Sequence, residues 1–121
     1  MGSNTERTAY GMTFRKIFSA AKKAAAKKDY SRFGDGVYSF EFDVTGEGGG
    51  RFYIEVRDGA ADIQPYDYQD ARCVFTLRSD ALMEILSGSV TPTALYSTGR
   101  LTLRGDSSAA FLLADSLGVR L

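Results

Sequence analysis

The stretch VYSFEFDV, residues 37–44, decides the fold, because its hydrophobicity repeats at every second residue. Four apolar side chains alternate with three polar ones, and this period is typical of a strand with one buried face. Before it, over residues 10–25, apolar residues recur at three- and four-residue steps, which is the period of a helix. The sequence Gly34-Asp35-Gly36 separates the two patterns. The chain is therefore expected to change from helix to sheet at this point.

The alternation continues beyond residue 44. After a glycine-rich loop at 46–50 it resumes over 52–57, and a third strand carries Ala61 and Ile63 inward. Between these strands stands Asp58-Gly59, a strong signal for a two-residue type I′ turn, because glycine adopts a positive φ at little cost. The pattern predicts an antiparallel meander of three strands.

The C-terminal half mixes both periods. An acidic, tyrosine-rich loop at 65–70 precedes a fourth strand, in which Cys73, Phe75 and Leu77 share one face. A helix capped by Ser79 should follow and stop at Gly88.

Next, Thr91 and Pro92 begin a short helix that ends at Gly99. Leu101 and Leu103 mark a brief fifth strand, and Asp106 caps a last helix that runs to about residue 117. The predicted fold is α+β, a five-stranded mixed sheet with helices covering one face.

Composition removes most catalytic chemistry. The chain has 121 residues, no histidine and one cysteine, with 15 basic and 15 acidic residues. This length fits a single domain, 1–121, with a core of its own. Without histidine there is no Ser-His or Cys-His catalytic arrangement and no histidine-ligated metal site. We therefore expect no catalytic residues, no metal, no cofactor and no nucleic-acid partner, and Cys73 is expected to be a buried hydrophobe.

The charges are nevertheless unevenly distributed. Residues 1–33 hold eight basic and two acidic residues, and residues 34–121 hold seven and thirteen. All five lysines fall within 16–28, on a helix whose narrow apolar stripe comprises Tyr10, Phe14, Ile17, Ala21, Ala24 and Ala25. The basic face of this helix is either solvated, or it binds peripherally to anionic membrane through Lys22, Lys23, Lys27 and Lys28.

The last predicted helix carries three consecutive apolar residues, 111–113. At 100° per residue they spread over roughly 200° of its circumference. One core cannot cover this arc, so a neighbouring element, a second subunit of a homodimer or a bound apolar molecule should cover the remainder. The helix could thus serve as a lid or as a dimer contact.

Three segments, in the same order along the chain, resemble the sterol carrier protein 2 (SCP2) family: VFTLRSD at 74–80, LSGSVTP at 86–92 and GRLTLRGD at 99–106. The likeness runs from about Phe52 to Leu113. It implies an SCP2-like fold with an apolar tunnel that holds a lipid, and no catalytic machinery. Many relatives carry tryptophan where this chain has Phe52 or Tyr53, which favours a fatty acid, acyl-CoA or isoprenoid over a sterol.

Twelve inward positions would line such a tunnel, or form a plain core if the interior is filled: Phe40, Phe42, Phe52, Ile54, Phe75, Leu77, Leu82, Leu86, Leu95, Leu103, Phe111 and Leu112. The predicted function is a non-catalytic carrier that holds a fatty acid, acyl-CoA, sterol-like or isoprenoid lipid in an apolar cavity. The alternative is an accessory or dimerisation module of a larger enzyme or of a quinone- or lipid-biosynthesis assembly. A hydrolase is the weakest hypothesis, because Glu41, Asp43 and Glu55 lie on the outward strand face without an activated nucleophile. No apolar segment long enough for a leader or a membrane span is present, so a cytoplasmic location is expected.

Overall fold

The computed structural model describes residues 13–121. Tyr10, the first residue of the predicted apolar stripe, lies outside them. The elements in chain order are α2 (Phe14–Ala25), the 3-10 helix η1 (Ser31–Phe33), β1 (Val37–Thr45), β2 (Gly50–Arg57), β3 (Ala60–Gln64), β4 (Cys73–Arg78), α3 (Ser79–Ser87), α4 (Pro92–Ser97), β5 (Leu101–Gly105) and α5 (Ser107–Leu117).

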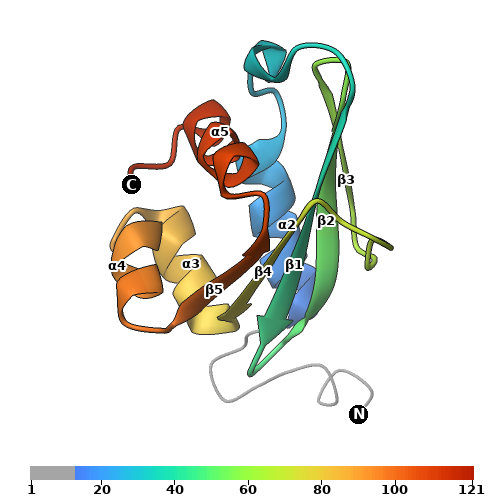
Figure 1. Cartoon of the computed structure of the whole chain (residues 1–121). Coiled ribbons are helices and arrows are strands. Elements are labelled where there is room, and N and C mark those ends of the chain that lie inside the picture. Colours follow the sequence, from blue (N-terminus) through green and yellow to red (C-terminus); the bar gives the residue numbers. More distant parts are fainter. Residues whose placement is uncertain (1–12) are drawn as a thin grey trace.

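The strands form one mixed sheet in the order β3-β2-β1-β4-β5 (Figure 1). The central pair, β1 and β4, is parallel, and the other neighbours are antiparallel. Between β2 and β3, Asp58 and Gly59 both have positive φ, 50° and 82°, as a type I′ turn requires. The predicted α+β fold with a five-stranded mixed sheet is confirmed.

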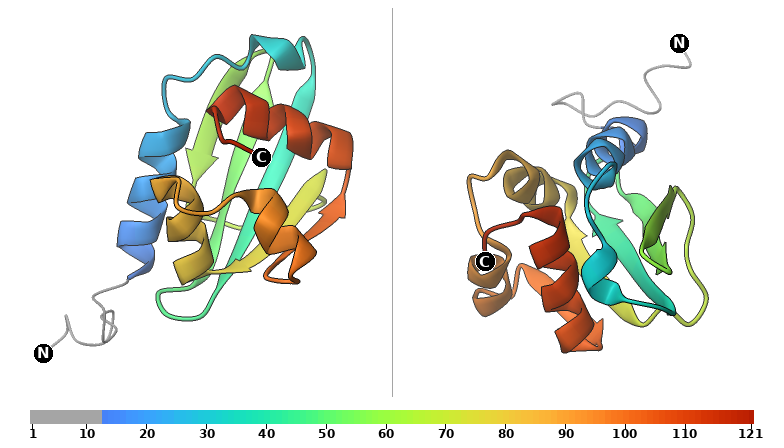
Figure 2. Two further views of the ribbon diagram at one scale, coloured as in Figure 1. Left: turned by 90° about the vertical axis from the view of Figure 1, so that its left-hand side faces the viewer. Right: turned by 90° about the horizontal axis from the view of Figure 1, so that it is seen from above.

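The helices lie on one face of the sheet, here called the inner face (Figure 2). Local chemistry begins most of them as predicted: Thr91 Oγ1 accepts from the Ala94 amide, and an Asp106 carboxylate oxygen accepts from the Ala109 amide, both at 3.2 Å. The prediction for Ser79 is wrong. Ser79 is the first residue of α3, and the capping position is held by Arg78 without a side-chain hydrogen bond. Asp80 accepts from the Ala81 amide instead, at 2.9 Å.

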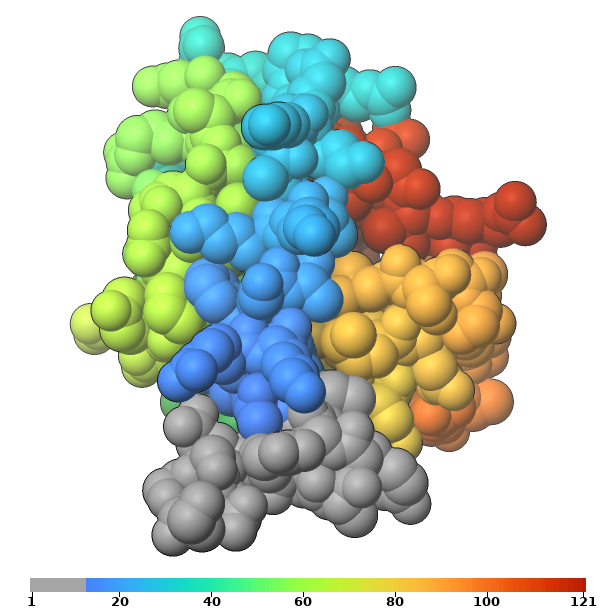
Figure 3. Space-filling view, turned by 180° about the vertical axis from the view of Figure 1, so that it is seen from behind, coloured from blue at the N-terminus to red at the C-terminus, as the bar shows by residue number. Residues whose placement is uncertain are grey.

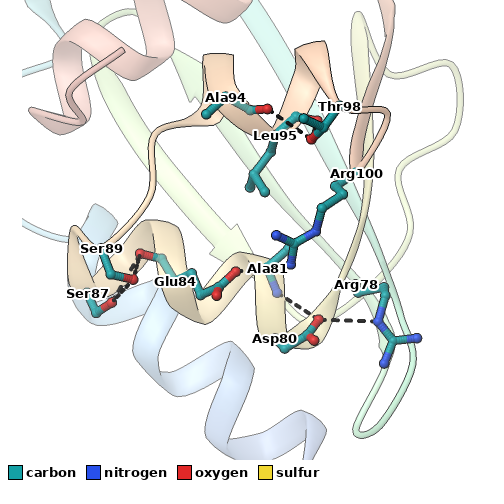
Figure 4. A network of polar contacts seen from close by, with 10 residues as sticks. All are labelled: Arg78, Asp80, Ala81, Glu84, Ser87, Ser89, Ala94, Leu95, Thr98 and Arg100. Atoms are coloured by element: carbon teal, nitrogen blue, oxygen red, sulfur yellow. Dashed lines mark hydrogen bonds and ion pairs between the residues drawn. The ribbon is translucent and has the colours of Figure 1, made fainter.

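Polar contacts connect α3 to neighbouring residues (Figure 4). Asp80 also pairs with Arg78 at 3.3 Å, and Glu84 pairs with Arg100 at 3.1 Å. The second pair joins α3 to the residue that precedes β5. Exposed ion pairs contribute little free energy, so the position of the α3–α4 unit beside the sheet depends mainly on its buried side chains, such as Leu82 and Leu95.

The core on the inner face consists of two clusters. The first core cluster lies near α5 and η1 and includes Phe33, Phe40, Ala109 and Leu113, whereas the second lies under α2, α3 and α4. The second includes Ile17, Phe52, Leu77, Leu82 and Leu95. Helix α2 contributes to both clusters, with Ala25 in the first and Ile17 in the second.

The start of α5 is fixed by a close backbone contact. Gly105 has φ +109°, and a Cβ at this position would lie 2.0 Å from the Arg72 carbonyl oxygen. That oxygen accepts a hydrogen bond from the Asp106 amide at 3.1 Å. Gly105 and Asp106 thus form the tight connection that leads the chain from β5 into α5.

The outer face of the sheet is partly covered by the loop that joins β3 to β4. Tyr68 donates its amide to Glu41 at 2.7 Å and its hydroxyl to Glu55 at 2.6 Å. Glu41 lies on the outward face, as predicted, but it is only 7% exposed because this loop covers it. A loop between distant strands was not predicted to pack back on this face.

The burial of Glu41 should make the free energy of unfolding depend on pH. Burial raises the pKa of Glu41, the Tyr68 amide lowers it, and neighbouring Asp43 raises it again, with a net increase. A folded-state pKa above the unfolded value of about 4.3 stabilises the fold at low pH, and this contribution is lost as the pH rises through the folded-state pKa. Glu41→Gln keeps an acceptor for Tyr68 but does not titrate. The free energy of unfolding of Glu41→Gln relative to wild type should therefore rise between about pH 4 and pH 7, measured by urea unfolding.

Glu47→Gln, at an exposed position of the β1–β2 hairpin, is the matched control. Its free energy of unfolding relative to wild type should change less with pH than that of Glu41→Gln. A pH-independent difference for Glu41→Gln would contradict the assignment.

Candidate functional site

Three half-buried phenylalanines lie where the two core clusters meet. Phe18, Phe42 and Phe75 pack against both clusters, and we call them the aromatic junction. The rings of Phe42 and Phe75, on the two central strands, are stacked with centroids 4.8 Å apart. Residues at the centre of a covered sheet face are normally its most buried ones. Here Phe42 and Phe75, at the centre of the inner face, are only half-buried, and part of their apolar surface is accessible to solvent.

The twelve predicted lining residues divide into three groups by burial. Six are buried: Phe40, Phe52, Ile54, Leu77, Leu82 and Leu95. Five are half-buried: Phe42, Phe75, Leu86, Leu103 and Leu112. The half-buried group comes from β1, β4, α3, β5 and α5. Phe42 and Phe75 pack against both clusters, Leu103 and Leu112 against the first only, and Leu86 against the second only. This half-buried group is the part of the predicted set that a bound apolar molecule could contact.

The twelfth residue, Phe111, does not point inward. Its side chain is 59% exposed, whereas Leu113, two residues later, is 2% exposed in the first core cluster. At 100° per residue, side chains two positions apart on a helix lie roughly 200° apart, so they point in nearly opposite directions. With Leu112, Val119 and Leu121, Phe111 lines an open groove of about 610 Å³ on the outside of α5. The wide apolar arc predicted for this helix is thus present, with Phe111 exposed, Leu112 half-buried and Leu113 buried.

A second groove was not anticipated from the sequence. It has a volume of about 330 Å³ and lies between the end of α2 and strand β3. Residues from Lys22 to Tyr30 form one wall, and 59–64 form the other. Sequence periodicity could not find it, because its walls come together only through tertiary packing.

The remaining chemistry of the described chain is sparse. Cys73 is fully buried, as predicted, and its thiol donates to the Asp106 carbonyl at 2.9 Å. Burial raises the pKa of this thiol, which disfavours the reactive thiolate. Within residues 13–121 no group of three or more His, Cys, Asp or Glu side chains could hold a metal ion. Among the helices of the same residues, none is both long and apolar enough to span a membrane.

Comparison with known proteins assigns the class. Residues 14–117 match the SCP-2 sterol transfer family. The chain belongs to this family, so the resemblance in its strand-helix and Gly-Asp segments is confirmed.

The curated relatives match this chain over a part of a larger protein. Hydroxysteroid dehydrogenase-like protein 2 from Xenopus tropicalis is 26% identical over 109 residues, covering 88% of this chain and 24% of that protein. The Bos taurus protein is 26% identical over 77 residues, covering 61% of this chain and 18% of that protein. The chain thus spans between 18% and 24% of these two relatives.

Solved structures share the fold at low sequence identity. Sterol carrier protein 2 like 2 from Aedes aegypti has a TM-score of 0.62 at 17% identity, covering 84% of this chain and 93% of that one. The ubiquinone synthesis protein UbiJ-SCP2 has a TM-score of 0.63 at 16% identity, covering 87% of this chain and 92% of that one. A palmitated form of the Aedes aegypti protein has a TM-score of 0.61 at 16% identity, covering 88% and 95%.

Proposed function

We propose that the chain is a non-catalytic carrier that binds a lipid with a single acyl or isoprenoid chain at the aromatic junction. The observation that carries this proposal is the accessible apolar surface of Phe42 and Phe75 at the centre of the inner face. A filled core would bury these rings, because their burial is favourable by about 1.5 to 3 kcal/mol each. An acyl chain between the two clusters would remove the same surface from water.

Family membership supports a lipid as the ligand class. One member of the same fold is described in a palmitated form, and a straight chain suits a site bordered by five separate elements. The half-buried side chains contributed by these elements are apolar, so they supply contact without donors or acceptors for chemistry. The ligand is therefore held and released unchanged.

Binding of a fluorescent fatty-acyl probe tests the proposal. Leu86→Gln places an amide beside the proposed site, and the cost of burying this group without a partner should weaken binding about tenfold. Val37→Gln is the control, because Val37 is an exposed apolar residue on β1 and its replacement should leave the affinity unchanged. Circular dichroism first verifies that both variants are folded. Equal affinities of the folded variants would place the probe elsewhere.

A protein contact surface is the second candidate function, and exposed Phe111 favours it. The groove that Phe111 lines on the outside of α5 is apolar on most of its wall, and clustered exposed apolar residues mark protein interfaces. Phe111→Ser should therefore lower the mass measured by light scattering if α5 joins two copies, with probe binding unchanged. A wild-type monomer that remains monomeric in the variant would argue against self-association.

Contact of the lysine-bearing helix with anionic membrane stays a prediction. Such contact is electrostatic, so vesicle binding should require anionic lipid and should weaken as salt rises.

A further inference from the structure

The five lysines of the chain have no acidic partner among residues 13–121. In every ion pair between these residues the cation is an arginine, as in the pair of Arg57 with Glu55 at 3.4 Å. Residues 14–28 hold six basic residues and no acidic one. We call their exposed side the basic face, and its unpaired lysines are Lys16, Lys22, Lys23, Lys27 and Lys28. This face carries positive charge that the described part of the chain does not neutralise.

The opposite charge is concentrated in the loop that covers the outer face, residues 65–70, here called the acidic strap. Its two carboxylates, Asp67 and Asp70, are exposed and pair with no cation of the described residues. Beside them the Tyr66 side chain is 62% exposed. Residues 41–70 hold eight acidic and two basic residues, and both arginines already pair with acids of the sheet. The acidic strap therefore carries unneutralised negative charge.

The acidic strap is held in one position on the sheet. The Tyr68 amide and hydroxyl donate to Glu41 and Glu55, and the Tyr68 ring packs edge-on against the Tyr53 ring with centroids 5.0 Å apart. A fixed loop loses little conformational freedom when a partner binds to it. Because Tyr66 stands beside two carboxylates, an ammonium group there would meet both opposite charge and an aromatic ring.

The two charged surfaces lie on opposite sides of the molecule. Ile17, Ala21 and Ala25 turn the apolar side of α2 towards the inner face, so the lysines point away from the sheet. Figure 3 shows α2, in blue, at the centre of this surface, whereas the acidic strap lies across the outer face (Figure 2). A helix layer about 10 Å thick already exceeds the screening length of about 8 Å at physiological salt. The two surfaces thus cannot neutralise each other within one molecule.

We propose that the acidic strap is a docking surface for the basic face of a second copy of this chain. In this contact the lysines of α2 in one copy lie against Tyr66, Asp67 and Asp70 of the other. Each copy then keeps one free surface of each kind on opposite sides, so the contact is head-to-tail and can be extended by further copies. Exposed ion pairs are individually weak, and the association is therefore transient and sensitive to salt. The contact uses neither the aromatic junction nor the groove on α5.

Sedimentation velocity tests the proposal at about 0.01 M and about 0.15 M salt, where the screening lengths are about 30 Å and 8 Å. Wild type should associate with rising protein concentration at the lower salt and much less at the higher. Asp67→Asn/Asp70→Asn, the strap variant, and Lys16→Gln/Lys23→Gln, the helix variant, should each lower the association constant about tenfold. Circular dichroism verifies that the variants are folded.

Asp35→Asn/Glu47→Gln is the matched control. It neutralises two exposed acids outside the acidic strap and has the same net charge as the strap variant. Its association should equal that of wild type.

Mixing the two variants tests the head-to-tail geometry. The strap variant keeps its basic face, and the helix variant keeps its acidic strap, so one intact contact can form between them. An equimolar mixture should therefore give a dimer that does not grow further, whereas wild type should grow beyond the dimer.

Several results would overturn the inference. Equal association at both salt concentrations would indicate an apolar contact, such as the groove on α5. Equal losses in the strap variant and its control would indicate net charge alone, and a mixture that stays monomeric would exclude the head-to-tail contact. Wild type that is monomeric at low salt but binds anionic vesicles would show that the basic face serves a membrane surface instead.

Discussion

Gly105→Ala is expected to lower the free energy of unfolding by at least about 3 kcal/mol. Two effects combine at this residue. The backbone has a φ of +109°, and the added Cβ would lie 2.0 Å from the Arg72 carbonyl oxygen. This oxygen belongs to the backbone beside β4, which cannot move away without breaking the pairing of β4 with β5. Urea denaturation followed by circular dichroism measures the loss.

Gly118→Ala is the matched control for this substitution. Gly118 also has a positive φ, +75°, but no atom within 4 Å of an added Cβ. Only the conformational cost of about 1 to 2 kcal/mol should remain. Equal losses at the two glycines would show that the close approach to Arg72 contributes nothing to stability.

Phe40→Ala should cost about 3 to 5 kcal/mol, because Phe40 is fully buried in the first core cluster and its removal leaves a cavity. Phe42→Ala, two residues along β1, should cost less, because Phe42 is only half-buried. The smaller loss should be accompanied by weaker binding of a fatty-acyl probe, by about tenfold, if the ring contacts the acyl chain as proposed. Unfolding in urea and probe titration give the two quantities.

The comparison between these two residues separates a site from a filled core. If Phe42→Ala destabilises the protein as much as Phe40→Ala and leaves the affinity for the probe unchanged, the aromatic junction is ordinary core. The proposed lipid position would then be wrong.

Local signals predicted the elements well. The alternation at 37–44 and 52–57 and the turn at Asp58-Gly59 each depend on residues close together in sequence, and all of them are confirmed. The cap at Thr91 likewise needs only residues up to Ala94. The parallel pairing of β1 with β4 could be expected only from the order of elements and from the family resemblance.

Burial was harder to predict, because it depends on what packs from elsewhere. Phe111 and Leu113 are both apolar residues of one helix, and only the position of α5 on the sheet decides which is exposed. Glu41 alternates with apolar neighbours like any outward residue, yet the loop carrying Tyr68 covers it. The lysine groove depends on contact between α2 and β3, which no local pattern contains. These are long-range contacts, and periodicity within one element carries no information about them.

The division of the core into two clusters has a consequence for the stability of the protein without a bound ligand. Helix α2 and the half-buried rings of the aromatic junction connect the two clusters, and rings that are only half-buried contribute less cohesion than a fully packed core would. A molecule bound at this seam acts as an additional core residue, and it stabilises the folded state by about 2.7 kcal/mol at a concentration one hundred times its dissociation constant. If a lipid binds there as proposed, ligand and polypeptide form one cooperative unit. Resistance to thermal unfolding or proteolysis should then measure how much of the protein is loaded.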